Sequence, residues 1–457
     1  MSMTDAPYTT TSAATAQKTE AGMDLVLGLG ATGLACARFL QASGRDVVVN
    51  DSRSLPPMAR RLQREQPQVE QHLGAFQPAL LARVDRVVLS PGIALDEPMV
   101  VAARDTDLPV ISDIDLFFEQ RRAPVAGITG SNGKSTVTCW LDAVLSAAGK
   151  RSVAGGNLGT PALDLLESPR PDAYILELSS FQLERSAALP LQCAALLNLT
   201  ADHLDHHGSM LAYSAAKARI FENAQTRVVH RDHMHMVPAG EGRVISFGVD
   251  APSAGHYGIR EEDGQAFLAH GDRLLISTTA LNLSLSHDQL NALAVLAMAE
   301  SLGVGWPMAH DGLVAFAGLD HRMQRVTQRD GVLWINDSKG TNVGASVAAI
   351  RSVGAPLVLI AGGDAKGAEL LPLAEAMQGR ARAAVVLGKD AAKLEAVLEG
   401  ICDVHRADDV ESAVRRADVL TRPGDTVLLS PACSSLDMYK NFEERGARFC
   451  AAVEALA

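Results

Sequence analysis

Short apolar runs alternate with longer amphipathic segments along most of the chain. Residues 25–27, 47–49 and 87–89 have the composition of buried strands, and an apolar helix follows the first of them. The same pattern restarts near Ala123 and again after Gly318. Strands that alternate with helices are typical of parallel βαβ layers. We therefore expect an α/β chain with domains at 23–112, 113–320 and 321–457, after a disordered tail at 1–22 that has no apolar periodicity.

Composition narrows the class of protein. The 457 residues are 47% hydrophobic and 21% charged, and the net charge of -12 would repel a nucleic acid. No run reaches the length of a membrane span, and the N-terminus lacks the pattern of a signal peptide. The six cysteines form no CxxC pair. A reducing cytoplasm, with no nucleic-acid partner and no membrane span, is therefore expected.

The strongest chemical signal is the segment 129–136, which follows a predicted strand at 125–128 and precedes a predicted helix. A loop in this context directs backbone N–H groups and the positive end of a helix at one point. Lys134 suits the β- and γ-phosphates of a nucleotide, and Ser135 suits Mg²⁺. The strict GxxxxGK[ST] pattern fails because Ile128 occupies its first glycine position. We interpret the segment as a variant nucleotide loop.

A second glycine loop lies near the N-terminus. Gly28, Gly30 and Gly33 follow a strand, and Asp51 lies about 20 residues further on, as in the dinucleotide fingerprint. This pattern allows NAD, FAD or a UDP-sugar equally, and it also occurs in a tight turn that binds nothing.

Carboxylates and histidines cluster after the central strands. Glu177 follows a predicted strand at 174–176, where a carboxylate can hold Mg²⁺. Of the polar run at 198–208, we expect Asp202 and His203 to act, and His206 and His207 to be solvated.

Other charged residues are less specific. His230, His233 and His235 are expected on a surface loop, and Lys217 by itself has the pattern of a solvated helix residue. In the third region, cationic residues at predicted strand ends would suit a γ-phosphate and an anionic amino acid: Arg322, Lys339 and Lys366.

Taken together, the motifs resemble those of the Mur ligase family, and the resemblance covers almost the whole chain after the tail. The segments that carry it are 28–33, 90–95, 128–136, 177–184, 334–339, 430–433 and 441–443.

The resemblance implies three domains: a Rossmann-like N-terminal domain for UDP, a central P-loop-type ATPase domain, and a Rossmann-like C-terminal domain for the amino acid. It implies ATP-dependent addition of D-glutamate to UDP-N-acetylmuramoyl-L-alanine through an acyl phosphate, during synthesis of peptidoglycan precursors. It also implies two Mg²⁺ sites, CO₂ bound as a carbamate on Lys217, and a monomer.

The resemblance assigns residues to each role. It implies that the catalytic residues are Lys134, Glu177, His203, Lys217 and Lys366. It implies that ATP contacts Gly130, Asn132, Gly133, Lys134, Ser135, Thr136, Asn291, His321, Arg322, Asp337 and Lys339. It implies that the UDP substrate contacts Gly30, Thr32, Asp51, Ser52, Arg53, Ser90, Pro91, Gly92 and Asn157. It implies that D-glutamate contacts Thr341, Lys366, Ser435, Leu436 and Phe442. It implies that the metal ligands are Ser135, Glu177, His203 and carbamylated Lys217.

Two positions depart from the family pattern. An Asp stands at 288 where the adenine motif has Asn, and Asp320 stands where the family has Pro before His-Arg. These departures concern nucleoside contacts and hinge geometry. Rival functions are another Mur ligase step or folylpolyglutamate synthesis, an NAD-linked oxidoreductase, and a non-catalytic nucleotide-binding protein. The lack of an Asp-Asn-Pro-Arg motif argues against the diaminopimelate-adding relative.

Overall fold

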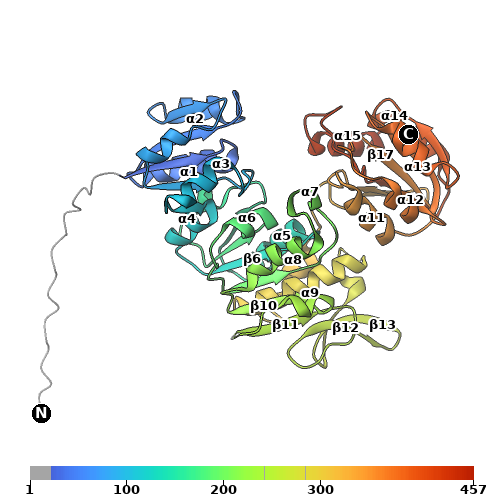
Figure 1. Ribbon diagram of the computed structural model, residues 1–457. Coiled ribbons are helices and arrows are strands. Elements are labelled where there is room, and N and C mark those ends of the chain that lie inside the picture. Colours follow the sequence, from blue (N-terminus) through green and yellow to red (C-terminus); the bar gives the residue numbers. More distant parts are fainter. Residues whose placement is uncertain (1–21, 241, 284, 457) are drawn as a thin grey trace, which may run out of the picture. The chain divides into compact units, whose positions relative to one another are not determined.

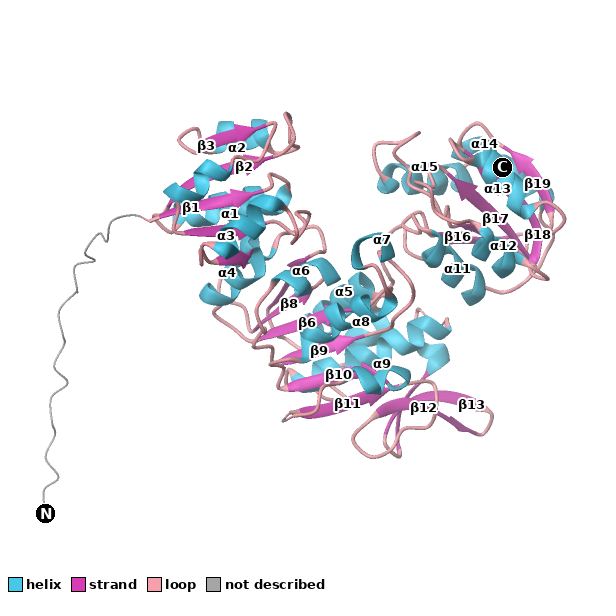
Figure 2. Ribbon diagram, in the orientation of Figure 1, coloured by secondary structure: helices cyan, strands magenta, loops and turns pink. Residues whose placement is uncertain are grey.

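The computed structural model describes residues 22–240, 242–283 and 285–456. Of the tail predicted at 1–22, residues 1–21 lie outside the described residues. The first compact unit ends at Leu116 and the second begins at Phe117. The described residues form three sheets, and Figure 2 shows their strands in magenta with helices in cyan alongside.

The first unit contains a five-stranded, all-parallel sheet in the order β3-β2-β1-β4-β5. Leu25, Leu27 and Val48 lie in its apolar core with Met99 and Val100. Its elements are β1 (Met23–Leu27), α1 (Ala31–Ala42), β2 (Asp46–Asp51), α2 (Ala59–Glu65), β3 (Glu70–Leu73), η1 (Pro78–Arg83), β4 (Arg86–Leu89), α3 (Pro98–Asp105) and β5 (Val110–Ser112), and α4 (Asp113–Gln120) crosses into the second unit.

The second unit opens with a nine-stranded sheet in the order β14-β13-β12-β11-β10-β9-β6-β8-β7. Figure 1 labels β6, β10, β11, β12 and β13 of this sheet. The seven strands from β6 to β12 are parallel, whereas β13 and β14 add an antiparallel edge. The strands are β6 (Val125–Thr129), β7 (Ser152–Gly156), β8 (Ala173–Glu177), β9 (Cys193–Leu196), β10 (Thr226–His230), β11 (Arg243–Phe247), β12 (Tyr257–Glu262), β13 (Gln265–His270) and β14 (Arg273–Ser277). The helices are α5 (Lys134–Ala147), η2 (Ala162–Glu167), α6 (Ser180–Arg185), α7 (Leu204–His207), α8 (Met210–Ala218), η3 (Arg219–Phe221), η4 (Arg231–Met236), η5 (Thr278–Ala280), α9 (Ser286–Ser301) and α10 (His310–Ala315).

Alternating side chains explain how helices cover both faces of this central sheet. Ala126 and Ile128 of β6 pack into a core that includes α5 and α9. A Cβ at Gly127 would instead lie 2.9 Å from Leu191, on the other side of the strand. Trp140 fixes α5 against α10, because its indole N–H donates to the Leu313 carbonyl at 3.1 Å. A period of two along a strand buried on both faces produces this arrangement.

The third sheet has the order β15-β16-β20-β17-β18-β19, and β15 is its antiparallel edge. Leu357, Leu359 and Ala361 of β17 face one apolar core, and Val358 and Ile360 face another. Its elements are β15 (Gln324–Arg329), β16 (Val332–Asn336), α11 (Val343–Ser352), β17 (Leu357–Gly362), α12 (Leu371–Met377), β18 (Ala381–Leu387), α13 (Ala391–Leu398), β19 (Asp403–Arg406), α14 (Val410–Leu420), β20 (Thr426–Leu429) and α15 (Phe442–Glu454).

The predicted fold class is confirmed, and each strand named from the sequence lies in an observed strand. The antiparallel edges were not foreseen. Within the described ranges, no helix is both long enough and apolar enough to cross a membrane.

Candidate functional site

The loop after β6 has the backbone of an anion-binding turn. Gly130 has φ 153° and Gly133 has φ 80°, values that side chains other than glycine rarely adopt. A Cβ at Gly133 would also lie 2.8 Å from Oδ1 of Asn291, which projects from α9. Helix α5 begins at Lys134, so its free N–H groups and the positive end of its dipole face the loop. These features fit the predicted nucleotide loop.

Two lysines converge on one carbonyl of this loop. Lys134 Nζ donates to the Gly130 and Ser131 carbonyls at 2.8 and 2.9 Å. Lys217 Nζ, on α8, donates to the same Gly130 carbonyl at 2.9 Å and lies 4.8 Å from the centre of the Tyr213 ring. Burial, followed by repulsion from Lys134, lowers the pKa of Lys217 to about 7. The prediction that Lys217 lies on a solvated face, made without the resemblance, is therefore wrong, because its side chain is buried.

An oxygen-rich group lies beside the lysines. Glu177 ends β8 and is buried; it accepts hydrogen bonds from Ser135 Oγ at 2.5 Å and Asn157 Nδ2 at 2.7 Å. A buried carboxylate next to a hydroxyl and an amide suits Mg²⁺, which prefers oxygen ligands. Ser135, Glu177 and Asn157 therefore come together, although the sequence assigned Asn157 to a different ligand.

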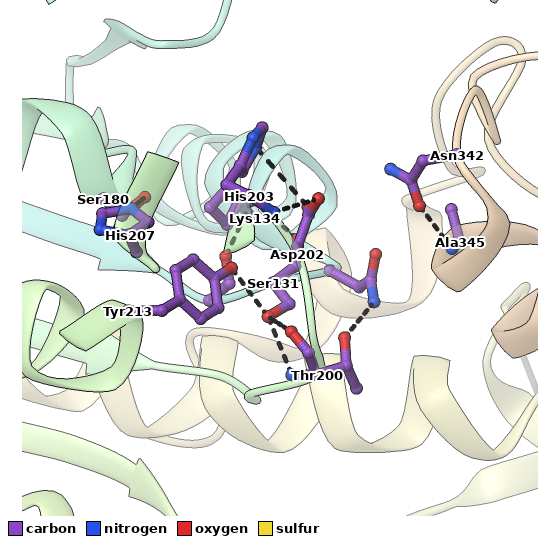
Figure 3. A network of polar contacts seen from close by, with 12 residues as sticks. Ser131, Lys134, Ser180, Thr200, Asp202, His203, His207, Tyr213, Asn342 and Ala345 are labelled. Atoms are coloured by element: carbon purple, nitrogen blue, oxygen red, sulfur yellow. Dashed lines mark hydrogen bonds and ion pairs between the residues drawn. The ribbon is translucent and has the colours of Figure 1, made fainter. Parts of the chain in front are cut away.

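A polar network joins the nucleotide loop to the segment after β9 (Figure 3). Ser131 Oγ donates to the Thr200 carbonyl at 2.9 Å and lies 3.0 Å from the Tyr213 hydroxyl. Asn198 pairs with Asn132 through its side-chain amide, at 2.9 and 3.1 Å. This network holds two segments that are about 66 residues apart in one arrangement.

His203 lies at the end of that segment and differs from the other predicted ligands. Its backbone has φ 52°, and its half-exposed ring lies 3.6 Å from Asp202 Oδ2. Figure 3 shows the two side chains facing each other. The role of His203 as a metal ligand beside Ser135, Glu177 and Lys217 stays a prediction.

The first glycine loop, in the N-terminal unit, is tightly packed. A Cβ at Gly33 would lie 1.9 Å from the Gly28 carbonyl oxygen, which also accepts from Ser90 Oγ at 3.0 Å. Asp51 is buried; its carboxylate accepts from Leu29 N at 2.7 Å and from the Arg53 guanidinium. These bonds hold the pKa of Asp51 below its usual value despite its burial, which by itself acts to raise it. Asp51 thus shapes the loop itself. Of the other residues predicted to contact UDP, Thr32 and Pro91 are partly exposed, and Ser52 and Gly92 are exposed. Gly30 lies directly before α1.

The carboxyl ends of β16, β17 and β20 meet in the third sheet. Arg445 of α15 is buried and donates to Ser338 Oγ and to the carbonyls of Ser338, Gly362 and Cys433, at 2.9 to 3.4 Å. Burial lowers its pKa to about 10. Because one guanidinium contacts residues that follow three strands, it fixes these loops relative to one another. Sequence reasoning missed Arg445, since an Arg in a helical pattern is usually exposed.

Asp337 lies in the same region, directly after β16. Ser430 Oγ donates to Asp337 Oδ2 at 2.7 Å, and Met323 N donates to Oδ1 at 3.3 Å. Burial raises the pKa of Asp337 to about 7. This carboxyl group therefore holds a proton at pH values where an exposed Asp is ionised.

The residues predicted to contact D-glutamate differ in exposure. Ser435 is buried, Leu436 is 66% exposed, and Lys366 is exposed with φ 52°. The Lys339 ammonium makes a cation–π contact with Phe442, 4.1 Å from the centre of its ring. Thr341 is partly buried, and Thr136 lies in the first turn of α5. His321 packs on α15, where a Cβ at Gly446 would lie 2.3 Å from its Nδ1; Arg322 follows it in the chain.

Comparison with known proteins identifies the family. Three domain models match in order: Mur ligase MurD-like N-terminal domain at 23–112, Mur ligase middle domain at 128–299, and Mur ligase glutamate ligase domain at 321–433. The chain is 46% identical over 440 residues to a UDP-N-acetylmuramoylalanine--D-glutamate ligase of Nitrosococcus oceani, covering 95% of this chain and 97% of that protein.

The chain belongs to the Mur ligase family. A protein of the same name from Pseudomonas syringae pv. tomato is 44% identical and covers 95% of this chain and 98% of its own length. Among solved structures, the UDP-N-acetylmuramate-alanine ligase of Thermotoga maritima matches with a TM-score of 0.59 at 18% identity, covering 95% of this chain and 100% of that one. At that identity the structural likeness shows the fold alone.

The two departures from the Mur ligase pattern have local explanations. Asp288 Oδ2 accepts from Leu285 N at 3.2 Å at the start of α9, and an Asn side-chain oxygen could accept the same bond. Burial raises the pKa of Asp288. Asp320 Oδ1 accepts from Gln324 Nε2 at 3.0 Å, which steadies the turn before β15.

We expect Arg445→Met to destabilise the C-terminal part of this Mur ligase by about 3 kcal/mol or more, because buried carbonyl acceptors lose their donor. Calorimetric unfolding measures the effect. Arg448→Met on the same helix is the control, since Arg448 is solvent-accessible and pairs with partly buried Glu411. Equal effects of the two substitutions would contradict the role assigned to Arg445.

Asp337→Asn should change how stability depends on pH. The folded carboxyl keeps its proton up to about pH 7, whereas an unfolded one loses it near 3.8. Between these values the folded state binds the extra proton, so this group's contribution to stability falls as pH rises through the window. The Asn variant lacks that loss, and its melting temperature relative to the parent should therefore be higher at pH 8 than at pH 5. A difference that is independent of pH would contradict the assignment.

Proposed function

We propose that this Mur ligase joins D-glutamate to UDP-N-acetylmuramoyl-L-alanine in an ATP-dependent reaction that forms an amide bond. The observation that carries the proposal is the near full-length similarity, at 46% identity, to a protein named for this reaction. The geometry around Lys134 and Glu177 supports a site that handles a nucleotide and a metal ion.

We assign ATP to the loop at 130–136 in the domain proposed for 113–320. Its backbone N–H groups and the start of α5 favour phosphate, and Lys134 can turn from the loop carbonyls toward the β- and γ-phosphates. Asn291 lies against Gly133 and would approach the nucleoside. The further nucleoside and phosphate contacts assigned in the C-terminal domain are His321, Arg322, Asp337 and Lys339.

The donor set fits Mg²⁺. Ser135 and Glu177 supply oxygen atoms, His203 is the proposed peripheral ligand, and two Mg²⁺ sites are proposed in all. When bound, Mg²⁺ would neutralise charge on the phosphate oxygens and on the carboxylate that is activated.

We further propose that Lys217 acts as a carbamate formed with CO₂. CO₂ adds to a neutral amine, and a pKa of about 7 leaves much of Lys217 neutral at slightly alkaline pH. A carbamate keeps one N–H, which can still donate to the Gly130 carbonyl, and adds a carboxylate beside the loop that carries Lys134. The adduct would thus convert a cation into an anionic metal ligand.

The remaining roles follow the domain order. The domain proposed at 23–112 would bind UDP through its glycine loop, where Asp51 supports the turn. Asn157 would contact the muramoyl substrate. The domain proposed at 321–457 would bind D-glutamate through Thr341, Lys366, Ser435, Leu436 and Phe442. We also propose that the enzyme acts as a monomer, as the family resemblance implies, and in the cytoplasm, which the scattered cysteines favour.

The reaction requires activation because a carboxylate is a poor acylating agent. Transfer of the γ-phosphoryl group to the L-alanyl carboxylate forms an acyl phosphate and ADP. The D-glutamate amine attacks the acyl carbon, and the tetrahedral intermediate expels phosphate to leave the amide. Lys134 and the loop N–H groups stabilise charge in the phosphoryl transfer chiefly by position.

A phosphate-release assay tests the reaction. We expect turnover with ATP, Mg²⁺, UDP-N-acetylmuramoyl-L-alanine and D-glutamate, and little with L-glutamate, diaminopimelate or a folate acceptor. Lys134→Ala should lower the rate by about 100-fold or more, because it removes a charge that stabilises the transition state. Turnover with another amine but not with D-glutamate would refute the proposed specificity.

Lys217→Ala tests the carbamate. We expect it to lose most activity and to regain part of it when acetate is added, since a free carboxylate can occupy the vacated place. Lys393→Ala, which removes an exposed lysine of α13, should behave as the parent. Full activity of Lys217→Ala without acetate would exclude the carbamate role.

A further inference from the structure

Helices α6 and α7 bring together three side chains that can ligate a transition metal, apart from the proposed Mg²⁺ group. They are Glu184 on α6 and His206 and His207 on α7, and one ligand atom of each lies within 4.8 Å of the others. His206 Nε2 is 2.9 Å from Glu184 Oε2. Among the residues that the structure describes, no other group of His, Cys, Asp and Glu meets this distance.

Local packing holds these side chains in place. Ser179 and Gln182 form a capping box that fixes the start of α6. The Phe181 ring lies 4.5 Å from the His206 ring and 5.6 Å from the His207 ring, measured between centroids. The short helix α7 ends at His207 and is followed by Gly208, whose φ is 71°. The two imidazoles therefore already lie against α6, so an ion could bind them without a rearrangement of the backbone.

His207 has a second polar partner, and Glu184 has a competing cation. His207 Nε2 lies 3.0 Å from Ser180 Oγ, as Figure 3 shows. Arg185 Nη1 donates to Glu184 Oε2 at 3.2 Å. A bound ion would have to displace the first contact or use the other ring nitrogen, and would share the carboxylate with Arg185, so moderate affinity is expected.

The chemistry of the group selects the kind of ion. Two imidazoles and one carboxylate are a ligand set for Zn²⁺, whereas Mg²⁺ prefers oxygen alone. The side chains of Glu184 and His206 are 30% and 25% exposed, which gives an ion access from solvent. Three protein ligands leave one tetrahedral position for water.

We propose that Glu184, His206 and His207 form a second cation site, selective for a borderline divalent ion such as Zn²⁺ over Mg²⁺. The ion would tie α6 to α7. Because His203 directly precedes α7, the same ion would restrain the segment that carries Asp202 and His203. The proposal does not depend on which amino acid the enzyme uses.

Calorimetric titration of tag-free, chelator-treated, full-length protein with ZnCl₂ in excess MgCl₂ tests the site. We expect one Zn²⁺ to bind, and His206→Gln and Glu184→Gln each to weaken binding at least tenfold, since even the loss of a supporting residue costs roughly 10- to 100-fold. Co²⁺ should give the visible absorption of a tetrahedral site, and both variants should lose that spectrum. These side chains are partly exposed, and far-ultraviolet circular dichroism would confirm that the variants fold.

His235→Gln is the matched control, because His235 lies in another histidine cluster with its ring 6.3 Å from that of His233. It should bind Zn²⁺ as the parent does. No Zn²⁺ binding by the parent, unchanged binding in the His206 and Glu184 variants, or loss of binding in the His235 variant would each overturn the proposal.

Discussion

The central site depends on the hydrogen bonds that Lys134 and Lys217 both donate to the Gly130 carbonyl. Two ammonium groups at one oxygen repel each other, and the lowered pKa of Lys217 reflects that repulsion together with burial. The arrangement persists because β6, β8 and β9 are neighbours in a parallel sheet and present their carboxyl ends at one edge. The loop is therefore a preformed site of positive charge, with the Glu177 carboxylate as its negative counterpart.

Much of this organisation could be predicted from the sequence. The continuous apolar runs of β1, β6 and β17 identify parallel strands, because a strand of this kind is buried on both faces of its sheet. The nucleotide loop at 129–136 could be predicted equally well. Gly133 allows the positive φ that the turn needs, and Lys134 supplies the cation for phosphate. The antiparallel strands β13 and β14 were missed. Residues 266–269 and 274–276 are apolar runs like that of β1, but only residues 271–272 separate β13 from β14, so no helix intervenes as it does in a βαβ unit.

The side chains that support the site could not be predicted in the same way. Asn198 and Tyr213 act through contacts with residues far away in the sequence, so no local pattern marks them. Asp51 illustrates a further limit: its spacing from Gly28 predicts a ligand contact but gives no sign of the hydrogen bonds that its carboxylate accepts from Leu29 N and Arg53. Spacing specifies which residues reach a loop, whereas competing donors decide what they bind once there.

Arg445 has a consequence for how the C-terminal domain is assembled. Its guanidinium is satisfied by oxygens that come into register only when β16, β17 and β20 are paired correctly. If one strand slipped by a residue, its carbonyl acceptor would move by about 3.3 Å, and the buried guanidinium would lose that hydrogen bond at a high cost in free energy. The buried cation thus disfavours folding intermediates in which a strand is out of register. Once Arg445 has all of its acceptors, the three loops at the strand ends are also in place.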